Sequence, residues 1–517
     1  MAEFVCAVDV GTRSARAGIF ASDGTMHARD IAPLSLHEGP GQRGEYSANQ
    51  IWQAVCAAIR AACKAADLAP DAVGALAFDA TCSLVLRRAD GSPLPLGPEG
   101  RDTIAWFDHR AIEEAAACTA AGGRMIEIQG GAMSPEMQTP KLLWLKRHRP
   151  DLWRDLAYAG DLCDWLALRA SGQATRSLCA ASAKWPWRPE GGWQTGFLAQ
   201  LGLQDISERA GLRTPSPVGT SAGQLSAQAA SETGLPAGIP VAVGLIDAFA
   251  GGLGAVGLFE REAAAGQCTL VTGTSSCLMA LGAGPETRAG IWGPYPGAIL
   301  PDLRVSEGGQ SAAGALLDHI LATWPGGDHE HAPVLAHLGT LLARHGPRLG
   351  EEIHILPDLA GNRAPRSDPL ARGVISGLTL DRGFDALCTL YWRAAVSLAL
   401  GVRQILGHMG CSNPEDPIAM TGGFARSPLL TQLFADVTGR RVLCHADRDP
   451  VLLGTASAAF CAMNPGTSLE QTVRRMTGAT VRFTPDSVAH RQYDRDFRIF
   501  QLMQAQRSEI VQLVEQA

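Results

Sequence analysis

The stretch FVCAVDVGTRSARAGIF at residues 4–20 predicts how the chain folds, because two apolar, β-prone runs flank a short turn of Gly, Thr and Ser. We expect strands at Phe4–Val10 and Ala15–Phe20, joined as a hairpin. A tight turn of this composition exposes consecutive backbone N–H groups and a hydroxyl, and such turns form concavities that bind anions. Gly11 and Thr12 therefore predict a phosphate-binding loop, with an ordinary hairpin as the alternative for a single copy.

A second copy of this pattern lies past the middle of the 517-residue chain. The apolar run Gln267–Val271 leads into Gly273 and Thr274, and a second apolar run follows at Cys277–Leu281. About half of the chain separates the two Gly-Thr pairs, which predicts two divergent copies of one unit. One turn from each half would hold a polyphosphate from both sides.

The two copies differ two positions before the first Gly. The first copy has Asp9 there, and the second has Val271. A carboxylate beside a phosphate loop can hold Mg²⁺ through oxygen or water ligands. Asp9 is therefore the candidate metal residue.

Composition limits the class of protein. Hydrophobic residues make up 46% of the chain and charged residues 18%, which excludes a disordered chain. The net charge of −7 argues against a broad nucleic-acid-binding surface. The 13 Cys form no C-x-x-C pair, and residues 1–4 show no secretion signal, so we expect reduced thiols and a cytoplasmic location.

The 21 residues Ile239–Phe259 imitate a membrane span but are interrupted by Pro240, by several Gly and by Asp247. A charge near the middle of a span is costly, so we expect a buried strand, an Asp-bearing turn and a helix of small residues. Asp247 is then either a helix cap or a site residue. A carboxylate at the end of a buried strand could take the proton of an attacking sugar hydroxyl.

Three further motifs each have two interpretations. Residues 421–427, TGGFARS, open a helix, where two Gly allow a ring or a phosphate to approach, or simply connect a strand to a helix. Gly252–Gly257 matches the G-x-G-x-x-G dinucleotide fingerprint but lacks the acidic residue expected after it, so packing is favoured. Asp328–His331, DHEH, suggests a metal site but lies between Gly and Pro residues, which favours a solvated loop.

Together these residues resemble the FGGY carbohydrate kinases, which have the actin-like ATPase fold, and within them the kinases of D-ribulose and other pentuloses. The resemblance runs from Phe4 to about Ala462. It is most specific at residues 78–85, FDATCSLV, and 133–146, MSPEMQTPKLLWLK. Residues 106–111, 177–179, 308–311, 361–365 and 422–427 also match the family pattern.

The resemblance implies a role for each matching position. Asp247 is implied to be the catalytic base, and Asp9 the acidic residue near Mg²⁺. The implied nucleotide and phosphate positions are Gly11, Thr12, Arg13, Gly273, Thr274, Gly309, Gln310, Gly422, Gly423 and Ser427. The implied sugar positions are Ala80, Thr81, Asp108, Glu136, Lys184, Asn362 and Asp247 itself.

Two positions depart from the family pattern. Phe249 stands where close relatives usually have His, so the preferred sugar can differ, and Arg13 replaces a small residue. Arg13 either adds a cation beside the phosphates or points to solvent.

The expected fold is α/β, with two ribonuclease-H-like domains that flank a cleft. Residues 1–260 would form the sugar-side domain, 261–465 the nucleotide-side domain, and 466–517 an extension with a helix at Arg491–Val514. The implied reaction is ATP- and Mg²⁺-dependent phosphorylation of D-ribulose to D-ribulose 5-phosphate. L-Ribulose, ribitol and D-xylulose remain alternative substrates. Two alternative activities also remain: a non-kinase actin-like ATPase and, from Gly252–Gly257 alone, an NAD-dependent oxidoreductase. The expected partner is a small sugar, without nucleic acid or membrane, and a homodimer is possible.

Overall fold

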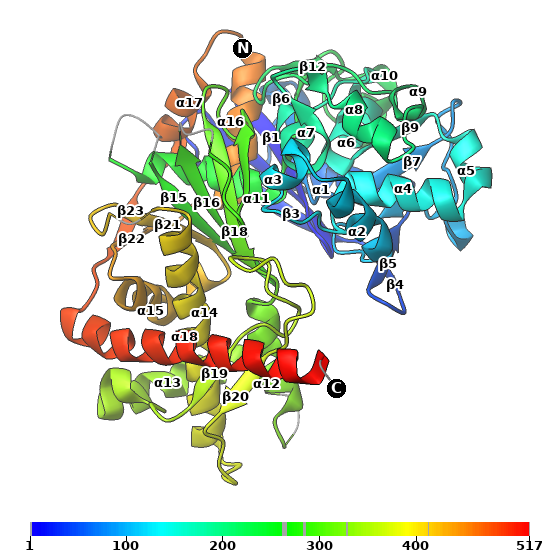
Figure 1. The fold of residues 1–517 in the computed structure, drawn as a ribbon. Helices are drawn as coiled ribbons and strands as arrows, with labels where there is room; N and C mark the ends of the chain where they lie inside the picture. Colours follow the sequence, from blue (N-terminus) through cyan, green and yellow to red (C-terminus); the bar gives the residue numbers. More distant parts are fainter. Residues whose placement is uncertain (1–2, 261–265, 283–285, 327–328, 412, 516–517) are drawn as a thin grey trace.

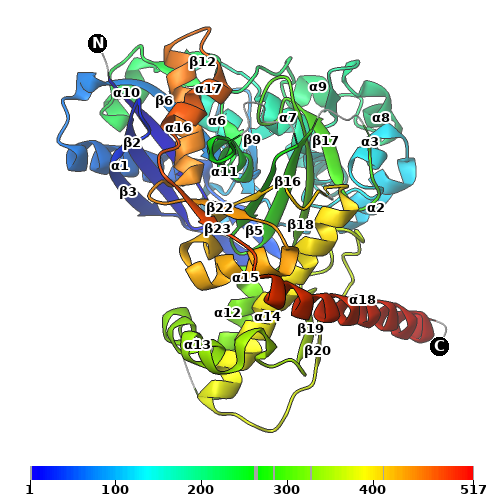
Figure 2. The same ribbon diagram turned by 90° about the vertical axis from the view of Figure 1, so that its left-hand side faces the viewer.

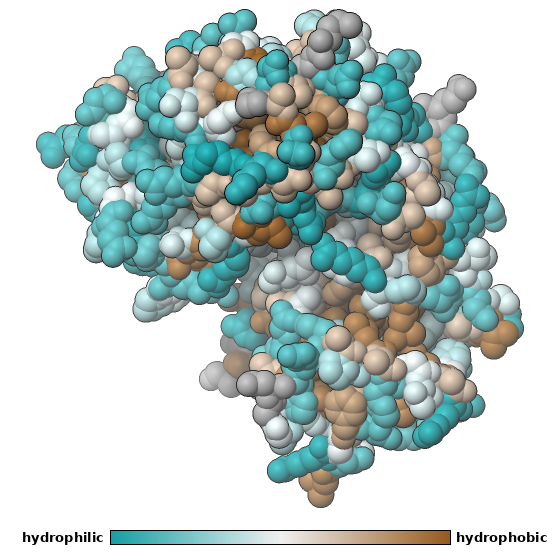
Figure 3. Space-filling view, turned by 180° about the vertical axis from the view of Figure 1, so that it is seen from behind, coloured by the Kyte–Doolittle hydropathy of each residue, from teal (hydrophilic) through white to brown (hydrophobic). Residues whose placement is uncertain are grey.

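The computed structural model describes residues 3–260, 266–282, 286–326, 329–411 and 413–515. Two large twisted sheets, one from each half of the chain, stand side by side, and a smaller helical lobe lies beneath the second sheet (Figure 1). Apolar side chains reach the surface of this lower lobe when it is seen from behind (Figure 3).

The first sheet contains the predicted hairpin. β1 (Phe4–Val10) pairs antiparallel with β2 (Ser14–Ala21), and β2 pairs with β3 (Met26–Pro33). On the other side of β1 the order continues through β6 (Val73–Ala80), β13 (Pro240–Ala242) and β12 (Ser221–Gln224), and β14 (Leu245–Ile246) also pairs with β6. The strands β1, β6 and β13 are parallel, so their carboxyl ends lie at one edge of the sheet.

The second sheet repeats this topology. Its members are β15 (Cys268–Thr272), β16 (Ser276–Gly282), β17 (Trp292–Pro296), β18 (Arg304–Gln310), β21 (Ile418–Gly422), β22 (Val442–His445) and β23 (Thr480–Phe483). The order β18-β16-β15-β21-β22 matches β3-β2-β1-β6-β13 strand for strand, including the antiparallel hairpin and the parallel neighbours. The repeat that the two Gly-Thr turns predict is therefore present in the fold.

Amphipathic patterning explains why the helices pack as they do. α1 (Ala48–Ala66), predicted at residues 50–67, buries Ile51, Trp52, Val55 and Ile59 on one face and packs on β2 and β3. It ends where Asp67 adopts a left-handed backbone with φ of 52°. Burying such an apolar face stabilises a helix more than intrinsic propensity does.

Two helices cross between the sheets, and each packs on the opposite half (Figure 2). α11 (Asp247–Gly254) follows the first sheet but contacts β15, and the residues after it pack with Ala419 and Leu443. α16 (Pro450–Met463) follows the second sheet but packs on β1 and β6.

Glycines allow this crossing to be close. A Cβ at Gly254 would lie 1.9 Å from the Pro450 carbonyl oxygen, and one at Gly454 would lie 2.1 Å from the Ala250 carbonyl oxygen. The glycines of the 252–257 motif thus serve helix packing, as the sequence favours. Among the described residues, no helix has both the length and the apolarity needed to cross a bilayer.

The remaining elements surround these sheets. In the first half they are β4 (His37–Gly39), β5 (Arg43–Tyr46), η1 (Pro70–Ala72), β7 (Leu84–Arg87), η2 (Pro98–Gly100), β8 (Thr103–Ile104), α2 (Ile112–Ala121), α3 (Arg124–Ile128), α4 (Gln138–His148), α5 (Pro150–Asp155), β9 (Tyr158–Asp161), α6 (Leu162–Ser171), α7 (Leu178–Lys184), β10 (Trp187–Arg188), β11 (Gly192–Trp193), α8 (Thr195–Gln200), α9 (Ile206–Arg209) and α10 (Ala227–Thr233). In the second half they are η3 (Val256–Leu258), α12 (Gly314–Thr323), α13 (His331–His345), η4 (Gly346–Arg348), β19 (His354–Leu356), β20 (Val374–Ser376), α14 (Phe384–His408), η5 (Phe424–Arg426), α15 (Pro428–Thr438), α17 (Leu469–Met476) and α18 (Ser487–Glu515).

Most of the C-terminal segment packs on the second half, whereas α17 packs on α16 and buries Leu469, Val473 and Met476 in the same core cluster as β1 and β6. β23 pairs with β22, and the predicted C-terminal helix is α18, which packs on α14 and α15. The DHEH motif differs from the expected loop at its end, because His331 begins α13 and contacts the Tyr391 hydroxyl at 2.8 Å. Asp328 lies outside the described residues.

Candidate functional site

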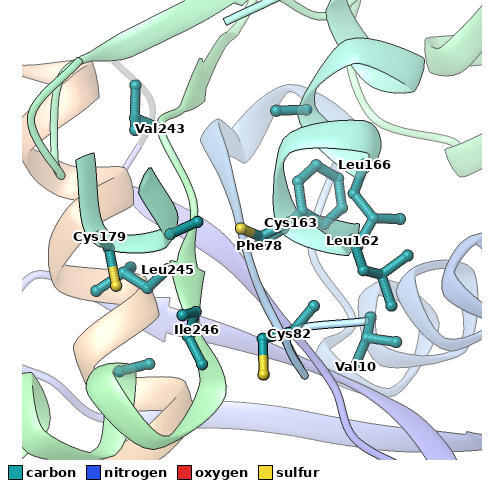
Figure 4. Packing of buried hydrophobic residues seen from close by; sticks show 14 of the residues in the cluster. Val10, Phe78, Cys82, Leu162, Cys163, Leu166, Cys179, Val243, Leu245 and Ile246 are labelled. Atoms are coloured by element: carbon teal, nitrogen blue, oxygen red, sulfur yellow. The ribbon is translucent and has the colours of Figure 1, made fainter. Parts of the chain in front are cut away.

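A cavity of about 1000 Å³ lies between the two halves. Its walls are the β1–β2 turn, the β15–β16 turn, the start of α11, the turn after β21 and the start of α16. Beneath it, Val10, Cys82 and Ile246 pack in the apolar core at the strand ends (Figure 4). The carboxyl ends of the parallel strands therefore open into one pocket, which is the usual ligand position in such sheets.

The first turn places an acidic residue at the end of β1. The Gly11 N–H donates to the Ser14 carbonyl oxygen at 3.0 Å, which closes the turn. Asp9 is buried and bonds to Arg16, whose guanidinium also lies 3.8 Å from Asp449. Burial raises the pKa of Asp9, and the Arg16 charge partly offsets this.

The second turn also begins with a Gly N–H that bonds a carbonyl oxygen further along the turn, but it is one residue shorter than the first turn and lacks the acid. The Gly273 N–H donates to the Ser275 carbonyl oxygen at 2.8 Å, and both Gly273 and Thr274 are exposed to the cavity. The Thr272 hydroxyl donates to the Thr421 carbonyl oxygen at 2.7 Å, which ties this turn to the Gly422–Gly423 segment. Because the Gly273 N–H closes the turn, the N–H groups that follow it in the turn are the ones that could hold phosphate oxygens.

Asp247 is the first residue of α11, while Ile246 occupies the N-cap position. Its Oδ1 accepts the Ala248 N–H at 2.7 Å, and its side chain lines the cavity. Burial, followed by the nearby charge of Asp9, raises the pKa of Asp247 to about 6. Asp247 is thus not a helix cap, and it is a carboxylate at neutral pH that can accept a proton.

The far end of the cavity carries charges from both halves. Lys184, at the end of α7, and Glu136, in the loop before α4, face Glu307 of β18 and Arg363 of the loop between β19 and β20. The Trp106 side chain closes one side and donates from Nε1 to the Thr12 hydroxyl at 3.0 Å. This arrangement offers hydrogen-bond donors and acceptors to a polar ligand.

Of the residues predicted for the site, Asp9, Gly11, Thr12, Thr81, Glu136, Lys184, Asp247, Gly273, Thr274, Gly422 and Gly423 line the cavity. Arg13 does not, and instead pairs with Glu38 at 3.1 Å on the surface. Gln310 is buried and bonds to the Ser276 hydroxyl and the Leu398 carbonyl oxygen. Ser427 caps α15 by accepting the Leu430 N–H.

The other predicted residues outside the cavity support neighbouring segments. Asp108 accepts from the Gly44 N–H at 2.8 Å, and Asn362 bonds to Asp358 within its own loop. Ala80 is buried at the end of β6, and Gly309 lies in β18. The binding roles of all these residues remain predictions.

Several residues that sequence reasoning missed also belong to the site. Asp79 lies opposite Asp9 in the β1–β6 register and accepts the Thr455 hydroxyl at 2.5 Å. Burial and the neighbouring Asp9 raise the pKa of Asp79 well above its usual value. The signal was present, because Asp79 directly precedes the quoted Ala80.

Asp79 itself is fully buried and does not line the cavity, whereas Arg16, Asp449, Glu307 and Arg363 do. Arg363 stands inside the quoted 361–365 segment and Arg16 inside the opening hairpin. Glu307 directly precedes the quoted 308–311 segment, and Asp449 is the N-cap of α16, but neither carries a motif that predicts a place in the site.

Comparison with known proteins agrees with this geometry. Residues 4–254 match the N-terminal domain model of the FGGY family of carbohydrate kinases, and residues 268–463 match its C-terminal domain model. An FGGY carbohydrate kinase domain-containing protein of Danio rerio is 36% identical over 98% of this chain and 98% of its own length. A D-ribulokinase of Saccharomyces cerevisiae is 34% identical, covering 85% of this chain and 68% of that protein.

Among solved structures, a xylulose kinase from Rhodospirillum rubrum superposes with a TM-score of 0.79 at 22% identity, covering 98% of this chain and 99% of that one. This likeness supports the fold. The predicted α/β fold of the actin-like ATPase type, with two domains, is therefore confirmed.

Proposed function

This chain belongs to the FGGY family of carbohydrate kinases, and from that premise we propose that it phosphorylates the terminal hydroxyl of D-ribulose with ATP. The observation that carries the proposal is the position of Asp247 in a cavity that both phosphate-type turns also line. Family membership makes the chain a carbohydrate kinase and sets aside the oxidoreductase and non-kinase alternatives. The choice of sugar rests on the similarity to a D-ribulokinase.

In the proposed reaction, Asp247 accepts the proton of the sugar hydroxyl as its oxygen attacks the γ-phosphorus. The new P–O bond forms as the bond to the β–γ bridging oxygen breaks, and ADP leaves. A pKa of about 6 suits this role, because the carboxylate is ionised at neutral pH and still basic enough to take a proton. The N–H groups that follow Gly11 and Gly273 in the two turns would stabilise charge on the transferring group.

The residues present also fit a magnesium ion. Asp9 and Asp247 face one cavity, and the charge of Asp9 raises the pKa of Asp247, so a cation near both would relieve their repulsion. Within the described residues, no three His, Cys, Asp or Glu side chains form a complete metal cage. Mg²⁺ typically binds through one or two carboxylates together with waters and substrate phosphates, so this donor set is sufficient. When bound, the ion would neutralise phosphate charge.

The charged side chains at the far end of the cavity, called here the acceptor end because the sugar would bind there, favour an uncharged sugar. Lys184 and Arg363 are balanced by Glu136 and Glu307, so a sugar acid would find no net positive charge. Phe249 adds an apolar wall, packed against Tyr295 with ring centroids 6.5 Å apart. A sugar with the wrong pattern of hydroxyls would leave donors and acceptors of the cavity without partners, and this cost would discriminate between sugars.

The test is an ADP-release assay coupled to a panel of D-ribulose, L-ribulose, D-xylulose, ribitol and gluconate. We expect the highest kcat/KM with D-ribulose and no turnover of gluconate. A higher kcat/KM with another pentulose or with ribitol would make that compound the preferred substrate, and the assignment as a carbohydrate kinase would stand. The cytoplasmic location, the homodimer and the domain limits at 260 and 465 stay predictions from the sequence.

A further inference from the structure

We propose that Arg363 is a positioning residue that joins the two halves at the acceptor end of the cavity and acts through Glu136. By holding this buried carboxylate across the domain boundary, Arg363 fixes a hydrogen-bond acceptor for the sugar and couples sugar binding to closure of the halves. The part of the inference that concerns the sugar rests on the proposed function. The part that concerns closure does not.

The first observation is an ion pair between the halves. Arg363 Nη2 lies 3.4 Å from Glu136 Oε1 and 3.3 Å from Oε2. The two side chains are only 11% and 12% exposed, and both line the cavity. Glu136 comes from the loop between α3 and α4, and Arg363 from the loop between β19 and β20. In the part of the chain that the structure describes, no strand pairing joins these loops, so the pair exists only while the halves are together.

The second observation is that Trp292 provides a shared surface for two cations. The Arg363 guanidinium lies 5.1 Å from the centre of the Trp292 ring, and Lys184 Nζ lies 4.8 Å from it. Lys184 belongs to the first half, while Trp292, in β17, belongs to the second. The Lys184–Trp292 contact therefore crosses the boundary in one direction, and the Arg363–Glu136 pair crosses it in the other. A planar guanidinium suits this position because it can stack on the ring and still present its fork of N–H donors to a carboxylate.

The third observation is electrostatic. Burial is the largest single influence on Glu136 and works to raise its pKa, but the charge of Arg363, the hydrogen bond from His109 and the charge of Lys184 together lower that pKa to about 2. Arg363 makes the largest of these lowering contributions, and His109 Nε2, 3.7 Å from Glu136 Oε1, comes from the same half as Glu136. Without Arg363, the carboxylate would stay buried with less compensation, and such groups protonate or draw in water. Either change removes the fixed acceptor.

The kinetic experiment compares Arg363→Gln, Glu136→Gln and the double variant with the wild-type protein. We expect each single variant to raise the KM for the sugar by about 30-fold or more, the range typical of breaking a buried charge pair, with KM for ATP changed less than twofold. The double variant should be no worse than the more damaging single variant, because both changes remove one pair. Arg363→Lys should restore less than half of the loss on a logarithmic scale.

Arg393→Gln is the matched control, because Arg393 forms a buried ion pair with Asp496 at 2.8 Å within the second half. It should lower the melting temperature without raising the KM for the sugar. Equal changes in sugar and ATP kinetics for Arg363→Gln, or additive effects in the double variant, would overturn the positioning role.

Closure is measured without activity, by hydrogen exchange of peptides that cover residues 129–137 and 288–296. Arg363→Gln should accelerate exchange in both peptides, and Arg393→Gln in neither. If the wild-type protein turned over no sugar in the panel, the proposed function would fail, but the exchange result would still show whether Arg363 holds the two halves together. Unchanged exchange in both peptides would contradict that role of Arg363.

Discussion

The two Gly-Thr turns have the same backbone role and different chemistry. Each closes a hairpin at the edge of a sheet with the same strand order, and both line one cavity. The β1–β2 turn has Asp9 and Arg16 beside it, while the β15–β16 turn has Val271 and Thr272 in the corresponding strand. The duplication has kept a Gly-Thr turn at the cavity in both halves, one residue shorter in the second half, and has concentrated ionisable groups beside the first copy. This would leave phosphate binding to both turns, and metal and proton chemistry to the first.

The largest effect is expected for Asp247→Asn, which removes the base from the first half. Turnover should fall by about 10²- to 10⁴-fold, the usual contribution of a general base, while KM for ATP changes little. Steady-state ADP release measures this, with circular dichroism as the check on folding. Near-wild-type turnover would remove the base assignment and leave the two turns alone to explain catalysis.

Asp9→Asn tests the charged turn. We expect the Mg²⁺ concentration for half-maximal turnover to rise by about 10- to 100-fold, the range seen when groups that tune a metal site are lost. The KM for the sugar should stay within twofold. A rise in the KM for the sugar without a change in Mg²⁺ dependence would mean that Asp9 serves the sugar rather than the metal.

The two turns differ chemically, but the two crossing helices are alike, because each has a Gly where it meets the backbone of the other. Gly254→Ala, in α11, and Gly454→Ala, in α16, should each lower the free energy of unfolding by about 1–3 kcal/mol, because the added methyl meets backbone on the other helix. Gly339→Ala, on α13 with nothing within 4 Å, is the control and should stabilise by about 0.5–1 kcal/mol. Denaturant unfolding gives these values, and a harmless Gly254→Ala would show that the helices can move apart.

Val271→Asp places a carboxylate in the turn that lacks one. Repulsion of the ATP phosphates should raise the KM for ATP by about tenfold, since like charges at about 4 Å cost 1–4 kcal/mol between water and the protein surface. Val271→Thr keeps the shape without charge and should be close to wild type. If Val271→Asp instead tightened Mg²⁺ binding, the two turns would be chemically interchangeable.

The pH dependence should be the mildest effect. Below a pKa of about 6, Asp247 is protonated and cannot act as a base, so kcat/KM should fall about tenfold per pH unit on the acidic side. In Asp9→Asn this acidic limb should move to lower pH, because the charge of Asp9 contributes to the raised pKa. A limb near pH 4 in the wild-type protein would show that burial does not perturb Asp247.

Local patterns in the sequence were sufficient for the hairpins, the duplication and the helix at Asp247, because each depends on neighbouring residues. They were also sufficient to place Gly11, Thr12, Gly273 and Thr274 at the cavity, but not for Arg13, which pairs with Glu38 on the surface. They could not identify Asp449, Glu307 or the pairing of Arg363 with Glu136, because these depend on contacts between segments far apart in the chain. Gln310 and Asn362 show the reverse case, since polar residues inside a matching motif bond to nearby backbone and side chains rather than facing the cavity.

The packing of α11 and α16, each on the opposite half of the molecule, has a consequence for synthesis on the ribosome. The first sheet gains its α16 contacts on β1 and β6 only after residues 450–463 have been made. Until then an apolar strip of that sheet faces solvent, the condition under which nascent chains engage chaperones. A fragment that stops after the first sheet should therefore be recovered folded only when the remainder of the chain is co-expressed with it.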